Sequence, residues 1–117
     1  MAATVLIVDD HASFRALARR MLEAYGYEIV GEAQDGASAL VAIARLNPSV
    51  VLLDVQLPDT DGFVLAERLV AGKDPPAVVL ISSRDASAYR RRLADSPARG
   101  FLAKSELSGP AVAALVA

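Results

Sequence analysis

The residues of this chain best suited to chemistry stand at the ends of apolar segments of strand length. Four segments share this feature: TVLIVDD (4–10), SVVLLD (49–54), AVVLIS (77–82) and RGFLAK (99–104). Their final residues are Asp9-Asp10, Asp54, Ser82 and Lys104. In an open parallel sheet the carboxyl ends of all strands lie along one edge, where ligands bind. We therefore expect three carboxylates, a hydroxyl and an ammonium group to meet at that edge.

Such a set predicts metal-assisted phosphate chemistry. Clustered carboxylates repel one another unless a cation neutralises them. The chain has no cysteine and one histidine, so the oxygen donors favour a hard divalent ion, above all Mg²⁺, which is commonly shared with phosphate oxygens. Lys104 would neutralise a phosphoryl group and Ser82 would donate a hydrogen bond to it. Asp54 is the best nucleophile, because carboxylates form aspartyl-phosphates.

Apolar runs alternate with amphipathic stretches, which is typical of βα units around a parallel sheet. A second strand is expected over 27–33, and the expected helices are one that Gly26 ends, one over 36–46 capped by Asp35, one over 63–72, one over 86–95 and one that begins at Ser108-Gly109-Pro110. Asp59 and Asp61 stand in a turn before a helix, so we expect loop or capping roles for both.

Composition narrows the class of protein. At 117 residues and 54% hydrophobic content, the chain predicts one domain, 1–117, whose strands are covered on both faces and which carries no effector domain. The apolar run 111–117 is far shorter than the ~20 residues of a membrane span, and the N-terminus lacks a secretory signal pattern. A net charge of −2 argues against direct nucleic-acid binding. We expect a cytoplasmic protein.

The ordered segments VLIVDD, LLDVQLPDTDG, VVLISS and GFLAK resemble a response-regulator receiver domain of the CheY-like family. The resemblance covers essentially the whole chain and implies a doubly wound, flavodoxin-like (βα)5 fold with strand order 2-1-3-4-5. It implies Asp54 as phosphoacceptor, with Lys104 beside it, and Ser82 and Phe101 as switch residues. The implied Mg²⁺ ligands are Asp10, Asp54, Asp9 mainly through water, and the backbone carbonyl of Gln56.

The same resemblance implies partners and a mechanism. A sensor histidine kinase or a histidine phosphotransfer protein would donate phosphate to Asp54. Phosphorylation would pull Ser82 inward and let Phe101 fill the vacated space, which changes the surface that a downstream protein recognises. A homodimer that forms on phosphorylation is one form of that output. Such a domain is not a classical enzyme, although it can hydrolyse its own aspartyl-phosphate.

Several alternatives stay open at this point. A degenerate receiver would bind partners without phosphate, but the full set of site residues argues against it. The GFLAKSELS ending also resembles receivers that precede helix-turn-helix effectors, so the chain could be a fragment of a transcription factor. A flavodoxin-like FMN carrier would need a hydroxyl- and glycine-rich loop where this chain has DDHASFR.

Some positions depart from the family pattern or lie beside the site. Ser105 follows Lys104 where the family often has proline, so the isomer of that peptide bond stays open. Pro97 indicates a short or irregular fourth helix. Gln56 and Arg84 are expected to flank the phosphate and tune its hydrolysis. His11 is interpreted as a polar loop residue and Arg90-Arg91-Arg92 as a solvated face.

Overall fold

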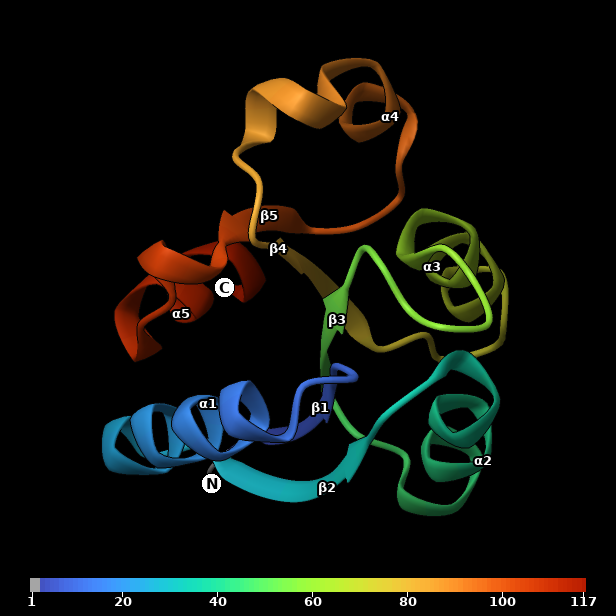
Figure 1. Ribbon diagram of the computed structural model, residues 1–117. Coiled ribbons are helices and arrows are strands. Elements are labelled where there is room, and N and C mark those ends of the chain that lie inside the picture. Colours follow the sequence, from blue (N-terminus) through green and yellow to red (C-terminus); the bar gives the residue numbers. More distant parts are fainter. Residues whose placement is uncertain (1–2) are drawn as a thin grey trace.

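The computed structural model describes residues 3–117, which form one parallel sheet with helices on both faces (Figure 1). The strand order is β2-β1-β3-β4-β5, as predicted. The strands are β1 (Thr4–Val8), β2 (Glu28–Ala33), β3 (Val50–Asp54), β4 (Ala77–Ser82) and β5 (Gly100–Ala103). The helices are α1 (Ala12–Tyr25), α2 (Gly36–Leu46), α3 (Gly62–Val70), α4 (Arg90–Asp95) and α5 (Gly109–Val116), with 3-10 turns η1 (Ala86–Tyr89) and η2 (Lys104–Glu106).

Alternation along the central strands builds two cores, one on each side of the sheet. In β3, Val51 and Leu53 pack with α2 and α3, whereas Val50 and Leu52 pack with α1 and α5. Successive side chains of a strand point to opposite faces, so an uninterrupted apolar run can serve both cores. In Figure 1, α1 and α5 lie on one side of the sheet and α2 and α3 on the other. The expected two-sided burial is confirmed.

Local caps set most helix boundaries where the sequence predicts them. Gly26 ends α1 with a φ of 114°, a left-handed conformation that glycine adopts readily. Asp35 caps α2 by accepting a hydrogen bond from the Ser38 backbone N–H at 2.8 Å. Ser108 caps α5 by accepting one from the Ala111 N–H at 3.1 Å, with a proline in the first turn.

The segment 86–95 is not one continuous helix, so that prediction is wrong in its first turn. It divides into the 3-10 turn η1 and the short helix α4. The Ser87 hydroxyl donates to the Asp85 carboxylate just before the break, the kind of local bond that competes with regular helix. α4 ends at Asp95, before Pro97, which agrees with the irregular fourth helix that Pro97 indicates.

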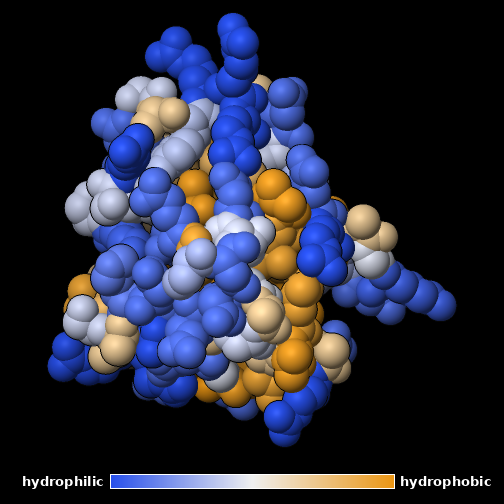
Figure 2. Space-filling view, turned by 45° about the vertical axis from the view of Figure 1, so that its right-hand side comes forward, coloured by the Kyte–Doolittle hydropathy of each residue, from blue (hydrophilic) through white to orange (hydrophobic). Residues whose placement is uncertain are grey.

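Three further features bear on the site and the surface. Among residues 3–117 no peptide bond is cis, so the bond between Lys104 and Ser105 is trans. None of the described helices has the length and apolar character to cross a membrane. Figure 2 shows the side of α2 and α3, where a strip of apolar side chains runs between hydrophilic ones. The large apolar residues exposed on these two helices are Val41, Leu46 and Val64.

Candidate functional site

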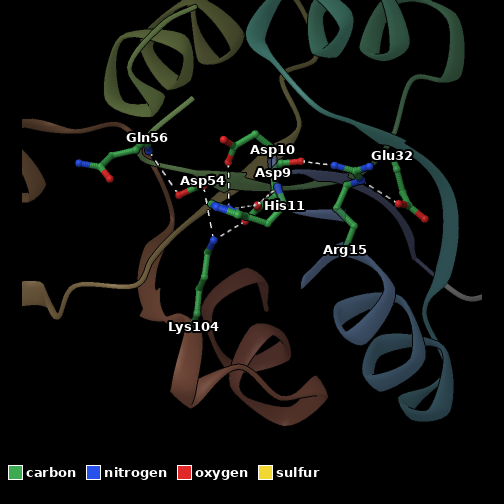
Figure 3. A network of polar contacts seen from close by, with 8 residues as sticks. All are labelled: Asp9, Asp10, His11, Arg15, Glu32, Asp54, Gln56 and Lys104. Carbon is green, nitrogen blue, oxygen red and sulfur yellow. Dashed lines mark hydrogen bonds and ion pairs between the residues drawn. The ribbon is translucent and has the colours of Figure 1, made fainter. Parts of the chain in front are cut away.

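Three carboxylates meet at the carboxyl edge of the sheet, as the strand ends predict. Asp9 and Asp10 follow β1, and Asp54 ends β3, which pairs with β1. Ligand atoms of these residues and of His11 all lie within 4.8 Å of one another (Figure 3). Asp9 is fully buried and Asp54 is 4% exposed, whereas Asp10 faces solvent. Buried like charges at this spacing are costly unless a cation lies among them.

Lys104 brings one cation to the cluster from η2, directly after the edge strand β5. Its Nζ lies 2.6 Å from Asp9 Oδ2 and 3.5 Å from Asp54 Oδ2. The ammonium group also lies 4.6 Å from the centre of the Phe14 ring, which favours a positive charge. The expected approach of Lys104 to the carboxylates is therefore present in the structure.

Asp54 carries the clearest electrostatic signal of the cluster. Its pKa rises from the ordinary 3.8 to about 6, chiefly because burial disfavours the charged form and then because Asp9 is near. Lys104 and the backbone N–H of Gln56, which donates to Asp54 Oδ1 at 3.3 Å, oppose the rise without cancelling it. Lys104 alone thus does not compensate the negative charge of the carboxylates.

The donor atoms suit a hard divalent cation. Within residues 3–117, Asp9 Oδ2 is buried and has no hydrogen-bond partner, although the ammonium of Lys104 lies 2.6 Å away. Carboxylate oxygens are the donors that such ions prefer, and an ion there would favour the charged form of Asp54, whose pKa is raised by burial and then by Asp9. The cluster therefore fits a metal on the evidence of its own atoms.

His11 lies within the carboxylate cluster, whereas the sequence indicated only a polar loop residue. Its backbone N–H donates to Asp9 Oδ1 at 2.8 Å. Its Nδ1 lies 3.2 Å from that oxygen and 3.1 Å from Asp10 Oδ1, although the side chain is largely exposed. The sequence could have indicated these contacts through the position of His11 directly after two aspartates. In the structure His11 is the N-cap of α1.

Arg15 holds the backbone of the β1–α1 turn and was not predicted as a site residue. Its Nη1 donates to the carbonyl oxygen of Asp9 at 2.6 Å, and its Nε donates to Glu32 at 3.0 Å (Figure 3). Arg19 donates to the other Glu32 oxygen at 2.8 Å. Arg19 and then Arg15 hold the pKa of Glu32 below its ordinary value, despite partial burial. The position of Asp9 is thus tied to α1 and β2.

Ser82 lies at the expected edge, but its hydroxyl is engaged elsewhere. The side chain is 2% exposed at the end of β4. Its Oγ accepts a hydrogen bond from the Arg84 backbone N–H at 3.1 Å and lies 3.0 Å from the Tyr89 hydroxyl. The Tyr89 ring packs against Phe101 on β5, with centroids 5.9 Å apart. Tyr89 had no signal in the sequence, because only the fold brings η1 over β4.

Asp61 caps the helix that follows it, as predicted, whereas Asp59 caps α2, which lies earlier in the chain. Asp59 accepts hydrogen bonds from the N–H groups of Gly36 and Ala37 at 2.8 and 3.0 Å, which hold its pKa below the ordinary value. Asp61 caps α3 and pairs with Arg92 at 2.6 Å. Arg92 therefore departs from the fully solvated face expected for the arginine run. Neither carboxylate belongs to the metal-fitting cluster.

Gly62 lets α3 start directly against the end of β3. Its N–H donates to the carbonyl oxygen of Val55 at 2.7 Å. A Cβ at this position would meet the carbonyl oxygen of Asp54 and come within 2.8 Å of the Val55 Cα. These are backbone atoms with little freedom to move, so the close approach requires glycine.

Comparison with known proteins adds to this geometry. The family described as "Response regulator receiver domain" matches residues 5–114. The chain belongs to the response regulator receiver family. This confirms the resemblance and the predicted function as a receiver, with the sheet order that the family implies.

Similar proteins include receivers of known structure and transcription regulators. The receiver of a response regulator from Mycobacterium tuberculosis, NarL, is 36% identical, with a TM-score of 0.87 over 98% of this chain and 96% of that one. BvgA of Bordetella pertussis, a transcription regulator, is 34% identical over 87% of this chain and 49% of its own length. EvgA of Escherichia coli, a DNA-binding transcriptional activator, is 30% identical over 96% and 55%. This receiver spans about half the length of these curated relatives.

Proposed function

We propose that this receiver accepts a phosphoryl group on Asp54, with Mg²⁺ bound by Asp9, Asp10, Asp54 and the backbone carbonyl of Gln56. The observation that carries the proposal is the position of Asp54 within the edge. The strand order places it between the carboxylates that follow β1 and the Ser82 and Lys104 side chains on the β4 and β5 side. A group bonded to Asp54 would thus have a metal site on one side and donors on the other.

The transfer itself is a displacement at phosphorus. A carboxylate oxygen of Asp54 forms the new O–P bond while the P–N bond to a partner's phosphohistidine breaks, and the electron pair returns to the imidazole nitrogen. With its pKa at about 6, Asp54 is mostly ionised at neutral pH and therefore ready to attack. The ammonium of Lys104 stabilises the transferred oxygens. Bound Mg²⁺ would neutralise charge on the phosphoryl group.

Partners and output follow from the family and from the relatives. The donor would be a sensor histidine kinase or a histidine phosphotransfer protein, in the cytoplasm. Because the chain spans about half of relatives that include a DNA-binding activator, we propose that it acts as the receiver of a helix-turn-helix transcription factor. The domain itself, 1–117, would bind no nucleic acid and would catalyse no more than loss of its own phosphate, at a rate tuned by Gln56 and Arg84.

Phosphate uptake tests the proposal. Incubation with acetyl phosphate and Mg²⁺ should add the mass of one phosphoryl group to the wild-type chain, and chelation of Mg²⁺ should prevent it. Asp54→Asn should take up none. The matched control is Asp59→Asn, a nearby carboxylate that caps α2 and should leave uptake intact. Uptake by Asp54→Asn at the wild-type level, or a wild-type chain that stays unmodified, would overturn the proposal.

A further inference from the structure

The Tyr89 hydroxyl is hydrogen-bonded to the Ser82 hydroxyl, the group that a phosphoryl group on Asp54 would need. Ser82 Oγ is buried at the end of β4, and its polar contacts are the Arg84 N–H at 3.1 Å and the Tyr89 hydroxyl at 3.0 Å. In the part of the chain that the structure describes, Ser82 has no hydrogen bond to Asp54. The side chain that should bind phosphate is therefore already engaged.

The direction of the bond between Ser82 and Tyr89 follows from counting donors. A serine hydroxyl has one proton to donate and can accept two hydrogen bonds. The Arg84 N–H uses one accepting position, and a buried hydroxyl proton needs an acceptor of its own. Among the hydrogen bonds of residues 3–117, the Tyr89 oxygen is the acceptor within reach. Tyr89 is only partly buried, so its own proton can bond to solvent.

We propose that Tyr89 is a positioning residue of the switch, which holds Ser82 away from Asp54 until phosphorylation. The inference rests on the proposed phosphorylation of Asp54. A phosphoryl oxygen is a charged acceptor, and hydrogen bonds to charged acceptors are stronger than those between neutral groups. Ser82 has one proton, so bonding to the phosphoryl group breaks the hydrogen bond that Ser82 donates to Tyr89.

The side chains packed around Tyr89 would transmit this change to the surface of the protein. Its ring lies 5.5 Å from the Phe63 ring and 5.9 Å from the Phe101 ring, measured between centroids. The Arg92 guanidinium of α4 stacks 4.4 Å from the centre of Phe63 and pairs with Asp61, the N-cap of α3. Movement of Tyr89 would thus disturb the start of α3, the helix α4 and the β5 residue Phe101 together.

The substitution Tyr89→Phe tests the inference because it removes only the hydroxyl and keeps the ring. Without its competitor, Ser82 should favour the phosphorylated conformation. The apparent affinity for beryllofluoride with Mg²⁺, a phosphoryl analogue, should rise about two- to tenfold, the range expected for one net hydrogen bond. Amide NMR titration measures that affinity. Tyr25→Phe, a change on an exposed tyrosine at the end of α1, should leave it unchanged.

A second background shows whether the effect passes through Ser82. In Ser82→Ala the Tyr89 hydroxyl has no partner to hold, so adding Tyr89→Phe should change the affinity no further. If wild type binds the analogue and Tyr89→Phe binds it no more tightly, the inference is wrong. An equal gain in the Ser82→Ala background would also overturn it. If wild type binds no analogue at all, the failure lies with the proposed function instead.

Discussion

Asp54 is a buried acid whose charge the surrounding protein does not fully compensate. Burial and the neighbouring Asp9 raise its pKa to about 6, even with Lys104 and a backbone N–H in contact. A carboxylate in this state gains from any added cation. The uncompensated charge of Asp54 therefore makes the metal-free protein less stable at neutral pH.

Stability should depend on pH in a direction set by Asp54. The folded chain binds this proton more tightly than the unfolded chain, so in metal-free buffer the stability that it contributes is full below the ordinary pKa of 3.8 and is lost as pH rises to about 6. Denaturant unfolding of wild type and Asp54→Asn measures the difference. The Asn variant should be the more stable of the two at pH 7, and their difference should shrink toward pH 4.

Added Mg²⁺ provides the control for that experiment. Because the proposed Mg²⁺ site is assembled in the folded state, the ion should stabilise the wild-type chain at pH 7. It should stabilise Asp54→Asn much less, since one proposed ligand has lost its charge. A difference between the two chains that stays constant from pH 4 to pH 7 would contradict the raised pKa of Asp54.

At the scale of elements, the β1–α1 turn is held by side chains that lie outside the carboxylate cluster. Arg15 of α1 binds the carbonyl oxygen of Asp9 and is oriented by Glu32 of β2, which Arg19 also binds. Residues that orient metal ligands commonly change metal affinity by one or two orders of magnitude. Arg15 is the one member of this trio that touches the turn directly.

Replacing Arg15 should therefore weaken the metal site. We expect Arg15→Met to lower Mg²⁺ affinity at least about tenfold, because the Asp9 backbone loses its charged donor. Calorimetric titration with Mg²⁺ measures the change. Arg19→Met is the matched control, since it removes an equal charge from the same glutamate and leaves the Asp9 contact in place. Equal losses in both variants would assign the effect to net charge.

At the scale of the whole molecule, the sheet separates two cores that should respond unequally to the switch. Tyr89, Leu93 and Phe101 pack against the core on the α2 and α3 side. The other core joins α1 and α5 to the opposite face. A change that starts at Ser82 and Tyr89 therefore reaches one core directly and the other only through the strands.

The amide spectrum should show this asymmetry. With beryllofluoride and Mg²⁺ bound, we expect the largest shift changes beyond the site itself in η1, α4, β5 and the start of α3. Residues of β2 and the carboxyl-terminal half of α1 should change little, because neither contacts the aromatic group around Tyr89. Changes of similar size in both halves of the molecule would show that the switch is not confined to one core.

The sequence alone determined those features that depend on local chemistry and on the alternation of elements. Caps at Asp35 and Ser108 and the end of α1 at Gly26 were predictable, because each depends on neighbours a few residues away. The meeting of Asp9, Asp54 and Lys104 was predictable as well, since parallel strands bring their carboxyl ends to one edge.

Only the tertiary structure decided which side chains touch one another at that edge. Three contacts join separate elements of the fold. They are the hydrogen bond between Ser82 and Tyr89, the bond from Arg15 to the carbonyl oxygen of Asp9, and the capping of α2 by Asp59. Their formation depends on how those elements pack and on the rotamers that packing allows, which no local pattern encodes. The strand ends thus specified where the site lies, and packing specified which groups hold its residues in place.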